Sequence, residues 1–202
     1  MHHKTPNPRK GQKHALAATI VSLGVAWMSG CSTATGLAAT HSQLGFPADP
    51  ARDPAVRGVV VYSCATDCPI GNAMAPELSR LADESGANGI RWVAIYPDEL
   101  ITADKVAKHQ REFALTMPAF PDPTLSLARA HGITATPEVV VYAPGGQMVY
   151  RGRIDDSWDF IGTRRKSPTR RDLKEVLDQL QHGKVPKPRV TEPVGCLLPP
   201  VP

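Results

Sequence analysis

Cysteines are the residues of this 202-residue chain with the greatest capacity for chemistry. Cys64 and Cys68 are separated by three residues, Cys196 lies near the C-terminus, and Cys31 follows an apolar segment. Pro69 favours the first turn of a helix, so we expect Cys68 where a strand gives way to a helix. Backbone N–H groups at a helix N-terminus stabilise a thiolate, which is a nucleophile and a ligand for soft metals. The sequence therefore predicts Cys68 as the reactive thiol.

A thiolate that attacks a disulfide or a peroxide needs a second thiol to resolve the product. Cys64 and Cys196 are both candidates. Cys196 lies 13 residues beyond Gly183, and an extended segment of that length spans ~40 Å, enough to fold back over a domain with a radius of ~15 Å. Alternatively, a disulfide of Cys196 could have the structural role of attaching the tail to the domain. The disulfide connectivity among Cys64, Cys68 and Cys196 therefore stays open.

The elements that must position these thiols follow from the hydrophobic pattern. We expect strands at 58–63, 90–96, 138–142 and 147–154, a short extended piece at 118–122, and helices at 69–82, 102–113, 124–131 and 171–181. Alternating strands and helices imply parallel strands, whereas the hairpin around 143–146 adds antiparallel ones. The predicted fold class is α/β, with a mixed central sheet flanked by helices on both faces.

The N-terminal segment has the pattern of an export signal. Residues 1–30 combine a basic start with an apolar run that is shorter than the ~20 residues of a membrane-spanning helix. The small residues before Cys31 resemble a bacterial lipoprotein signal, which implies a lipid-modified Cys31 and a membrane-anchored protein in the cell envelope, facing the periplasm. The alternatives are a plain secretory signal and an uncleaved anchor. All of them put the domain where disulfides persist.

Charge is concentrated in that signal. The formal net charge is +4, and the four charged residues before Cys31 are all Lys or Arg, so the remainder is formally neutral. A basic surface for nucleic acid is therefore not expected. We interpret 31–56 as a flexible tether, 57–183 as the folded domain and 184–202 as an extended, Pro-rich tail that carries Cys196.

Two segments resemble known redox proteins. Ala-Thr-Asp-Cys-Pro at 65–69 resembles the active-site entry of lipid-anchored thiol-disulfide reductases, and 132–146 resembles the segment that carries their cis-proline. The chain thus resembles the thioredoxin-like superfamily, specifically its exported redoxin and AhpC/TSA-type members. The resemblance implies a cis Pro137 beside Cys68, and a substrate groove shaped by Thr136, Pro137 and Pro69.

The motifs of the best-known members are incomplete. Gly71 stands where a thioredoxin pair needs its second Cys, and Ala65 stands where peroxiredoxins place a Thr. The Cys64-x-x-x-Cys68-Pro69 run also resembles the Sco copper chaperones, and two thiolates suit Cu(I). A Cu(I) site would take His131 as third ligand, although Ala135 occupies the position at which that family keeps its His. Without copper, no metal or other cofactor is expected.

Three hypotheses follow. The first is an exported thiol-disulfide oxidoreductase or redoxin-type antioxidant enzyme, which acts on protein disulfides or peroxides and is served by a reductant protein. The second is a Cu(I)-binding chaperone. The third is a binding domain that keeps the fold without catalysis. His109 and His131 are interpreted as surface or capping residues, and Glu138, directly after Pro137, is a candidate to tune the reactive thiol.

Overall fold

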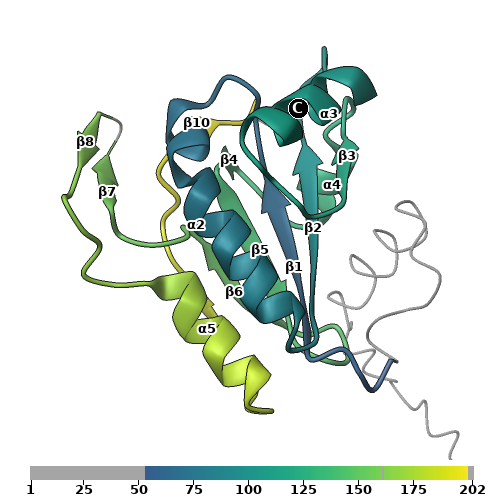
Figure 1. The fold of residues 1–202 in the computed structure, drawn as a ribbon, viewed down its shortest axis with the longest axis vertical. Helices are drawn as coiled ribbons and strands as arrows, with labels where there is room; N and C mark the ends of the chain where they lie inside the picture. The colour runs from purple at the N-terminus through teal and green to yellow at the C-terminus, as the bar shows by residue number, and fades with distance from the viewer. Residues whose placement is uncertain (1–52, 161, 200–202) are drawn as a thin grey trace, which may run out of the picture. The chain divides into compact units, whose positions relative to one another are not determined.

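A six-stranded mixed sheet forms the centre of the protein. The computed structural model describes residues 53–160 and 162–199, and the strands lie in the order β3-β2-β1-β5-β6-β9 (Figure 1). Their bounds are β1 Gly58–Ser63, β2 Ile90–Tyr96, β3 Ala119–Pro121, β5 Glu138–Tyr142, β6 Met148–Gly152 and β9 Arg189–Val190. β1, β2 and β3 run parallel, and β5 is antiparallel to both β1 and β6. The predicted mixed sheet is confirmed.

Helices cover both faces of this sheet, as predicted. They are α2 (Pro69–Gly86), α3 (Ala103–Glu112), α4 (Ser126–Ala130) and α5 (Asp172–Gln181). Apolar side chains of α2, α3 and α5 pack with Val60 and Tyr62, whereas those of α4 pack with Val59 and Val61. Successive side chains of a strand point to opposite faces, so the fully buried, β-branched β1 supplies both cores.

The helix boundaries follow from local chemistry, with one correction. Thr102 caps α3 by accepting a hydrogen bond from the backbone N–H of Lys105 at 3.3 Å, as the sequence predicts. By contrast, α2 continues to Gly86 and exceeds the predicted 69–82. Its last turn is held by Ser85, which is buried and accepts a hydrogen bond from the indole N–H of Trp92 at 2.8 Å.

The C-terminal segment differs most from expectation. Predicted as an extended tail, it adds two short strands to the domain: β9 pairs in parallel with β6, and β10 (Cys196–Leu197) pairs antiparallel with β4 (Ala135–Thr136). In Figure 1 this yellow segment returns to β4 near the start of α2. Strands of two residues are too short to leave a periodic pattern, so their pairing was not predictable from the sequence.

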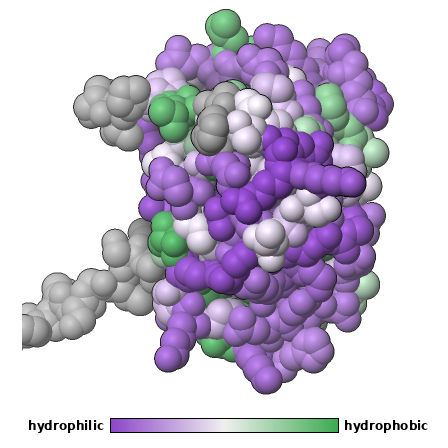
Figure 2. All heavy atoms as spheres, turned by 90° about the vertical axis from the view of Figure 1, so that its left-hand side faces the viewer, coloured by the Kyte–Doolittle hydropathy of each residue, from purple (hydrophilic) through white to green (hydrophobic). Residues whose placement is uncertain are grey.

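A second short hairpin, β7 (Trp158–Phe160) with β8 (Thr163–Arg164), lies beyond β6. It and α5 belong to a face that is largely hydrophilic (Figure 2). The predicted signal peptide, Cys31 and the tether up to residue 52 lie outside the described residues. Among the residues that are described, no helix combines the length and apolar character needed to cross a membrane.

Candidate functional site

Cys68 lies where the loop that follows β1 meets the first turn of α2. It is the N-cap residue, with extended backbone, and Pro69 opens the helix, which confirms the predicted placement. The side chain is 0% exposed. Its thiol donates a hydrogen bond to the carbonyl oxygen of Thr136 at 3.1 Å, and the Thr136–Pro137 peptide bond is cis, as predicted. The reactive-thiol candidate is therefore buried, and it is buried against residues 134–137, called here the proline loop.

Cys196 approaches Cys68 from the tail. The two sulfur atoms are 3.3 Å apart, and β10 pairs Cys196 directly opposite Thr136. A disulfide bond measures ~2.05 Å, so the thiols need approach by little more than one ångström to bond. Among the described cysteines, all of which are free thiols, Cys196 is exposed whereas Cys64 and Cys68 are buried. The structure thus brings together the two thiols and the proline loop.

Gly195 allows this close approach. A Cβ atom at Gly195 would lie 2.0 Å from the carbonyl oxygen of Thr136 and 2.9 Å from Cδ of Pro137. Any larger residue would force the tail away from the loop. One residue beyond β10, the backbone N–H of Leu198 donates to the carbonyl oxygen of Thr134 at 2.9 Å. The tail is therefore seated closely along 134–137.

A second anchor holds the tail upstream. The backbone N–H of Thr191 donates to the carbonyl oxygen of Arg151 at 2.9 Å, and its hydroxyl lies 2.6 Å from the hydroxyl of Tyr150. Gly152, with φ of 138°, lets the chains meet, because a Cβ there would lie 2.2 Å from the carbonyl oxygen of Thr191. With one anchor on each side, Cys196 is presented to Cys68 by packed structure.

Glu138 holds the proline loop in place through hydrogen bonds. The buried carboxylate accepts hydrogen bonds from the backbone N–H groups of Thr134 at 2.7 Å and Ala135 at 3.1 Å, and it lies 3.6 Å from Nε of Arg151. The sequence made Glu138 a candidate to tune the reactive thiol. Its hydrogen bonds are instead with Thr134 and Ala135 in the loop, so it supports the shape of the site.

Cys64 occupies a different environment, although only three residues separate it from Cys68. It is sealed in the core, and burial raises the pKa of its thiol to about 11. Its sulfur lies 4.0 Å from Nδ1 of His109. A thiol enclosed by core side chains cannot be reached by a substrate, so Cys64 is suited to a structural role.

His109 links the cysteine loop to two helices. Asn72 donates through its amide nitrogen to the carbonyl oxygen of Thr66 at 3.3 Å, which leaves its amide oxygen to accept from Nε2 of His109 at 2.8 Å. The other ring nitrogen lies 2.9 Å from the hydroxyl of Tyr96. Burial lowers the pKa of His109, which favours the neutral ring. The predicted surface role of His109 was wrong.

Tyr62 is a site residue that sequence reasoning missed. Its hydroxyl is buried without a hydrogen-bond partner among the described residues, and burial raises the pKa of this phenol well above its usual value. A Cβ atom added at Gly71 would lie 3.7 Å from that hydroxyl and 3.8 Å from the sulfur of Cys68. The phenol therefore lies near the reactive sulfur, and it also interacts with the Cys64 thiol. Its place on the same strand face as Cys64 was the available signal.

His131 is not brought to the cysteines. Its Nδ1 lies 2.7 Å from the hydroxyl of Tyr142, which belongs to the apolar cluster on one face of the sheet, whereas Cys64 and Cys68 belong to the cluster on the other. The expected copper ligand set is therefore corrected, and the predicted surface role of His131 was wrong because the residue is buried. Within the described residues, no group of three or more His, Cys, Asp or Glu side chains could hold a metal ion.

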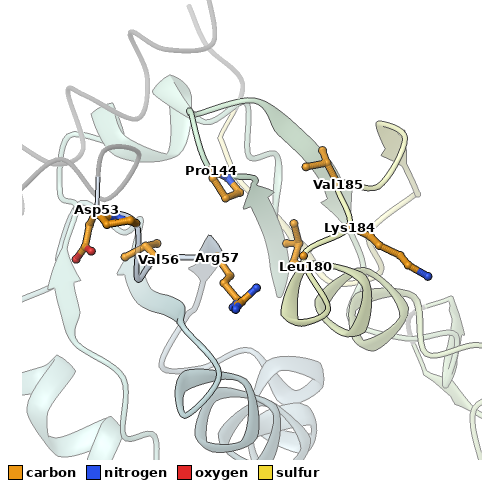
Figure 3. Close-up of a pocket in the computed structure, with 9 residues that line it drawn as sticks. Asp53, Val56, Arg57, Pro144, Leu180, Lys184 and Val185 are labelled. Carbon is orange, nitrogen blue, oxygen red and sulfur yellow. The ribbon is translucent and has the colours of Figure 1, made fainter.

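Two hollows of different character lie at opposite ends of β1. One, of about 260 Å³, is lined at the end where β1 begins by residues that include Val56, Arg57 and Leu180, and Figure 3 shows no cysteine among the side chains that it labels. The other, of about 390 Å³, is lined by residues that include Thr136 and Cys196. Only the second can expose a substrate to sulfur chemistry.

Comparison with known proteins agrees with this architecture. The AhpC/TSA family profile matches residues 51–151. A hypothetical protein from Sinorhizobium meliloti 1021 is 24% identical, with a TM-score of 0.62 over 71% of this chain and 79% of its own. An uncharacterised conserved protein from Geobacillus kaustophilus is 26% identical, with a TM-score of 0.62 over 72% and 78%. A Neisseria meningitidis protein provisionally named a thioredoxin is 13% identical, with a TM-score of 0.50 over 65% and 79%. No curated protein matches.

Proposed function

The chain belongs to the AhpC/TSA family of thioredoxin-like proteins, and from this premise we propose that it is an exported redox protein that cycles Cys68 and Cys196 between two thiols and one disulfide. The observation that carries the proposal is the 3.3 Å separation of the two sulfur atoms across the β4–β10 pair. Both thiols are held at the proline loop, where an intramolecular disulfide needs only a small approach.

The cycle transfers two electrons. With a disulfide substrate, the Cys68 thiolate attacks one sulfur and expels the other as a thiolate, and Cys196 then attacks Cys68 and releases the reduced substrate. With a peroxide, the thiolate takes one oxygen to become a sulfenic acid while water or an alcohol leaves, and Cys196 condenses with it and releases water. Either route ends in the same disulfide, which two thiols of an external reductant reduce. Sulfur carries all the electrons, so no metal or organic cofactor is required.

Cys196, and not Cys64, is the resolving thiol in this proposal. Cys196 is exposed and in contact with Cys68, whereas Cys64 is sealed beside His109. The export signal at residues 1–30 and the lipid-modified Cys31 complete the proposal, because a periplasmic location would let the disulfide persist.

The decisive experiment maps the disulfide. The reduced protein is treated with hydrogen peroxide or with a disulfide oxidant, free thiols are alkylated, and peptides are identified by mass spectrometry. We expect a single peptide pair that joins Cys68 to Cys196, formed equally well in Cys64→Ser. A pair that joins Cys64 to either of the others, or three alkylated thiols after full oxidation of a substrate, would refute the proposed couple.

A further inference from the structure

We propose that the groove beside Cys196 is the docking site of the reductant, and that its occupant is an extended, basic, thiol-bearing polypeptide segment that attacks Cys196. This groove, called here the Cys196 groove, has a volume of about 390 Å³ and includes Asp67, Asp98, Glu99, Leu100, Cys196 and Leu197 in its lining. The inference rests on the proposed Cys68–Cys196 couple and assigns its regeneration to one sulfur and one class of partner.

Accessibility selects the sulfur that is attacked. Cys68 is 0% exposed beneath the tail, whereas Cys196 is exposed. Among the described residues that line the groove, Cys196 is the only cysteine. An incoming thiolate must reach the sulfur that it attacks, and the sulfur of the pair that a polypeptide can reach from this groove is that of Cys196.

Exchange at Cys196 takes two steps. The reductant thiolate bonds to the sulfur of Cys196, the Cys68–Cys196 bond breaks, and Cys68 leaves as a thiolate and takes up a proton. A second thiol of the reductant then attacks the reductant sulfur of the mixed disulfide, and Cys196 leaves as a thiolate and is protonated.

Charge defines the occupant. Asp67, Asp98 and Glu99 line the groove, and no Lys or Arg does among the described residues. None of the three carboxylates forms an ion pair within that part of the chain. Lys105 is a nearby cation, but its ammonium donates to the carbonyl oxygen of Leu100 at 2.9 Å and does not line the groove. Asp98 accepts a hydrogen bond from the backbone N–H of Leu100 at 2.8 Å and keeps its charge. Carboxylates without a cationic partner attract a basic segment and repel an acidic one.

Apolar contacts come from two leucines. Leu100 is 76% exposed and Leu197 is 81% exposed, and they flank the carboxylates in the same groove. Large apolar side chains that remain this exposed beside a reactive residue favour contact with a partner. A small thiol would use neither the leucines nor the charges, so these features point to a polypeptide.

The test measures reduction of the oxidised protein by two synthetic peptides of equal length, each with a single Cys, flanked by Arg in one and by Glu in the other. Each rate is divided by the rate of the same peptide with 2-hydroxyethyl disulfide, which removes differences in intrinsic thiol reactivity. At 50 mM NaCl, we expect the corrected rate of the Arg peptide to be ~10-fold higher. The ratio should fall towards ~2 at 500 mM NaCl, because salt screens surface charges.

Variants and adduct mapping complete the test. Asp98→Asn/Glu99→Gln should lower the ratio as salt does, whereas Glu84→Gln/Asp178→Asn removes equal charge elsewhere and should leave it unchanged. The mixed disulfide, trapped with acid, should map to Cys196. Equal corrected rates for the two peptides, or an adduct on Cys68, would overturn the inference. Dithiothreitol separates the two proposals. If it reduces a Cys68–Cys196 disulfide while the Arg and Glu peptides show equal corrected rates, the couple stands and only the docking site fails.

Discussion

Two thiols separated by three residues occupy opposite chemical situations. Cys64 is sealed beside His109 in a hydrogen-bonded core, and its pKa is raised to about 11 by burial. Cys68 is equally buried, but its cover is the proline loop and a tail that carries a second thiol at 3.3 Å. Burial by core side chains removes a thiol from chemistry, whereas burial by a seated tail supplies the reaction partner.

The comparison also separates structural from reactive polar contacts. Around Cys64, each ring nitrogen of His109 is engaged, by Asn72 and by Tyr96, so the network holds the cysteine loop in place. Around Cys68, the contacts come from segments distant in sequence, and one of these segments carries the exposed residue Cys196. We therefore expect substitutions at the two cysteines to affect different measurements.

The largest expected effect is on turnover. Cys196→Ser should lower steady-state peroxide or disulfide reduction by ~100-fold or more, because the resolving thiol is lost along with its high effective concentration. Cys64→Ser, the matched control, should keep turnover within ~2-fold. A larger loss of turnover in Cys64→Ser than in Cys196→Ser, with circular dichroism and melting temperature equal to those of the wild type, would contradict the assignment of Cys196 as the resolving thiol.

A thiol placed at Gly71 should replace the tail thiol. The Cβ atom of such a side chain would lie 3.6 Å from Cβ of Cys68, within the ~3.5–4.5 Å range of disulfides. In a Cys196→Ser background, Gly71→Cys should therefore restore an intramolecular disulfide in most molecules after oxidation. Thiol counting and peptide mapping measure this, with Gly71→Ser in the same background as control. Recovery of only free thiols would contradict the geometry.

The buried Cys64 should make stability depend on pH in the alkaline range. Its pKa is raised from 9.0 to about 11, so the folded state binds more protons between those values. The stabilisation is fully present below pH ~9 and is lost as the pH rises towards ~11, amounting to about 3 kcal/mol. Urea unfolding of the reduced protein at several pH values should show a steeper loss in wild type than in Cys64→Ala. Parallel curves would mean that Cys64 ionises freely.

Detaching the tail should have the smallest effect. Gly195→Ala places a Cβ atom against the carbonyl oxygen of Thr136, so β10 must shift and disulfide formation should slow by ~10-fold. Gly86→Ala is the control, since a Cβ atom there meets nothing within 4 Å. The rates are measured by adding peroxide, quenching samples at successive times with an alkylating reagent, and counting the remaining free thiols. An unchanged rate in Gly195→Ala would mean that tail seating does not govern the approach of the thiols.

Local signals were enough to predict the strand-to-helix junction at Cys68, because Pro69 and the β-branched run before it act over a few residues. The cap at Thr102 and the mixed sheet follow from the same kind of signal. The cis-proline at Pro137 was implied by family resemblance.

The choice of the thiol that partners Cys68 depends on the packing of the folded chain. Cys64 is nearer in sequence, but Cys196 reaches Cys68 because β10 pairs with β4 and Gly195 lets the chains touch. The same packing places His131 across the sheet from the cysteines. Pairing between two-residue strands depends on contacts that join distant segments, and local periodicity carries no record of them.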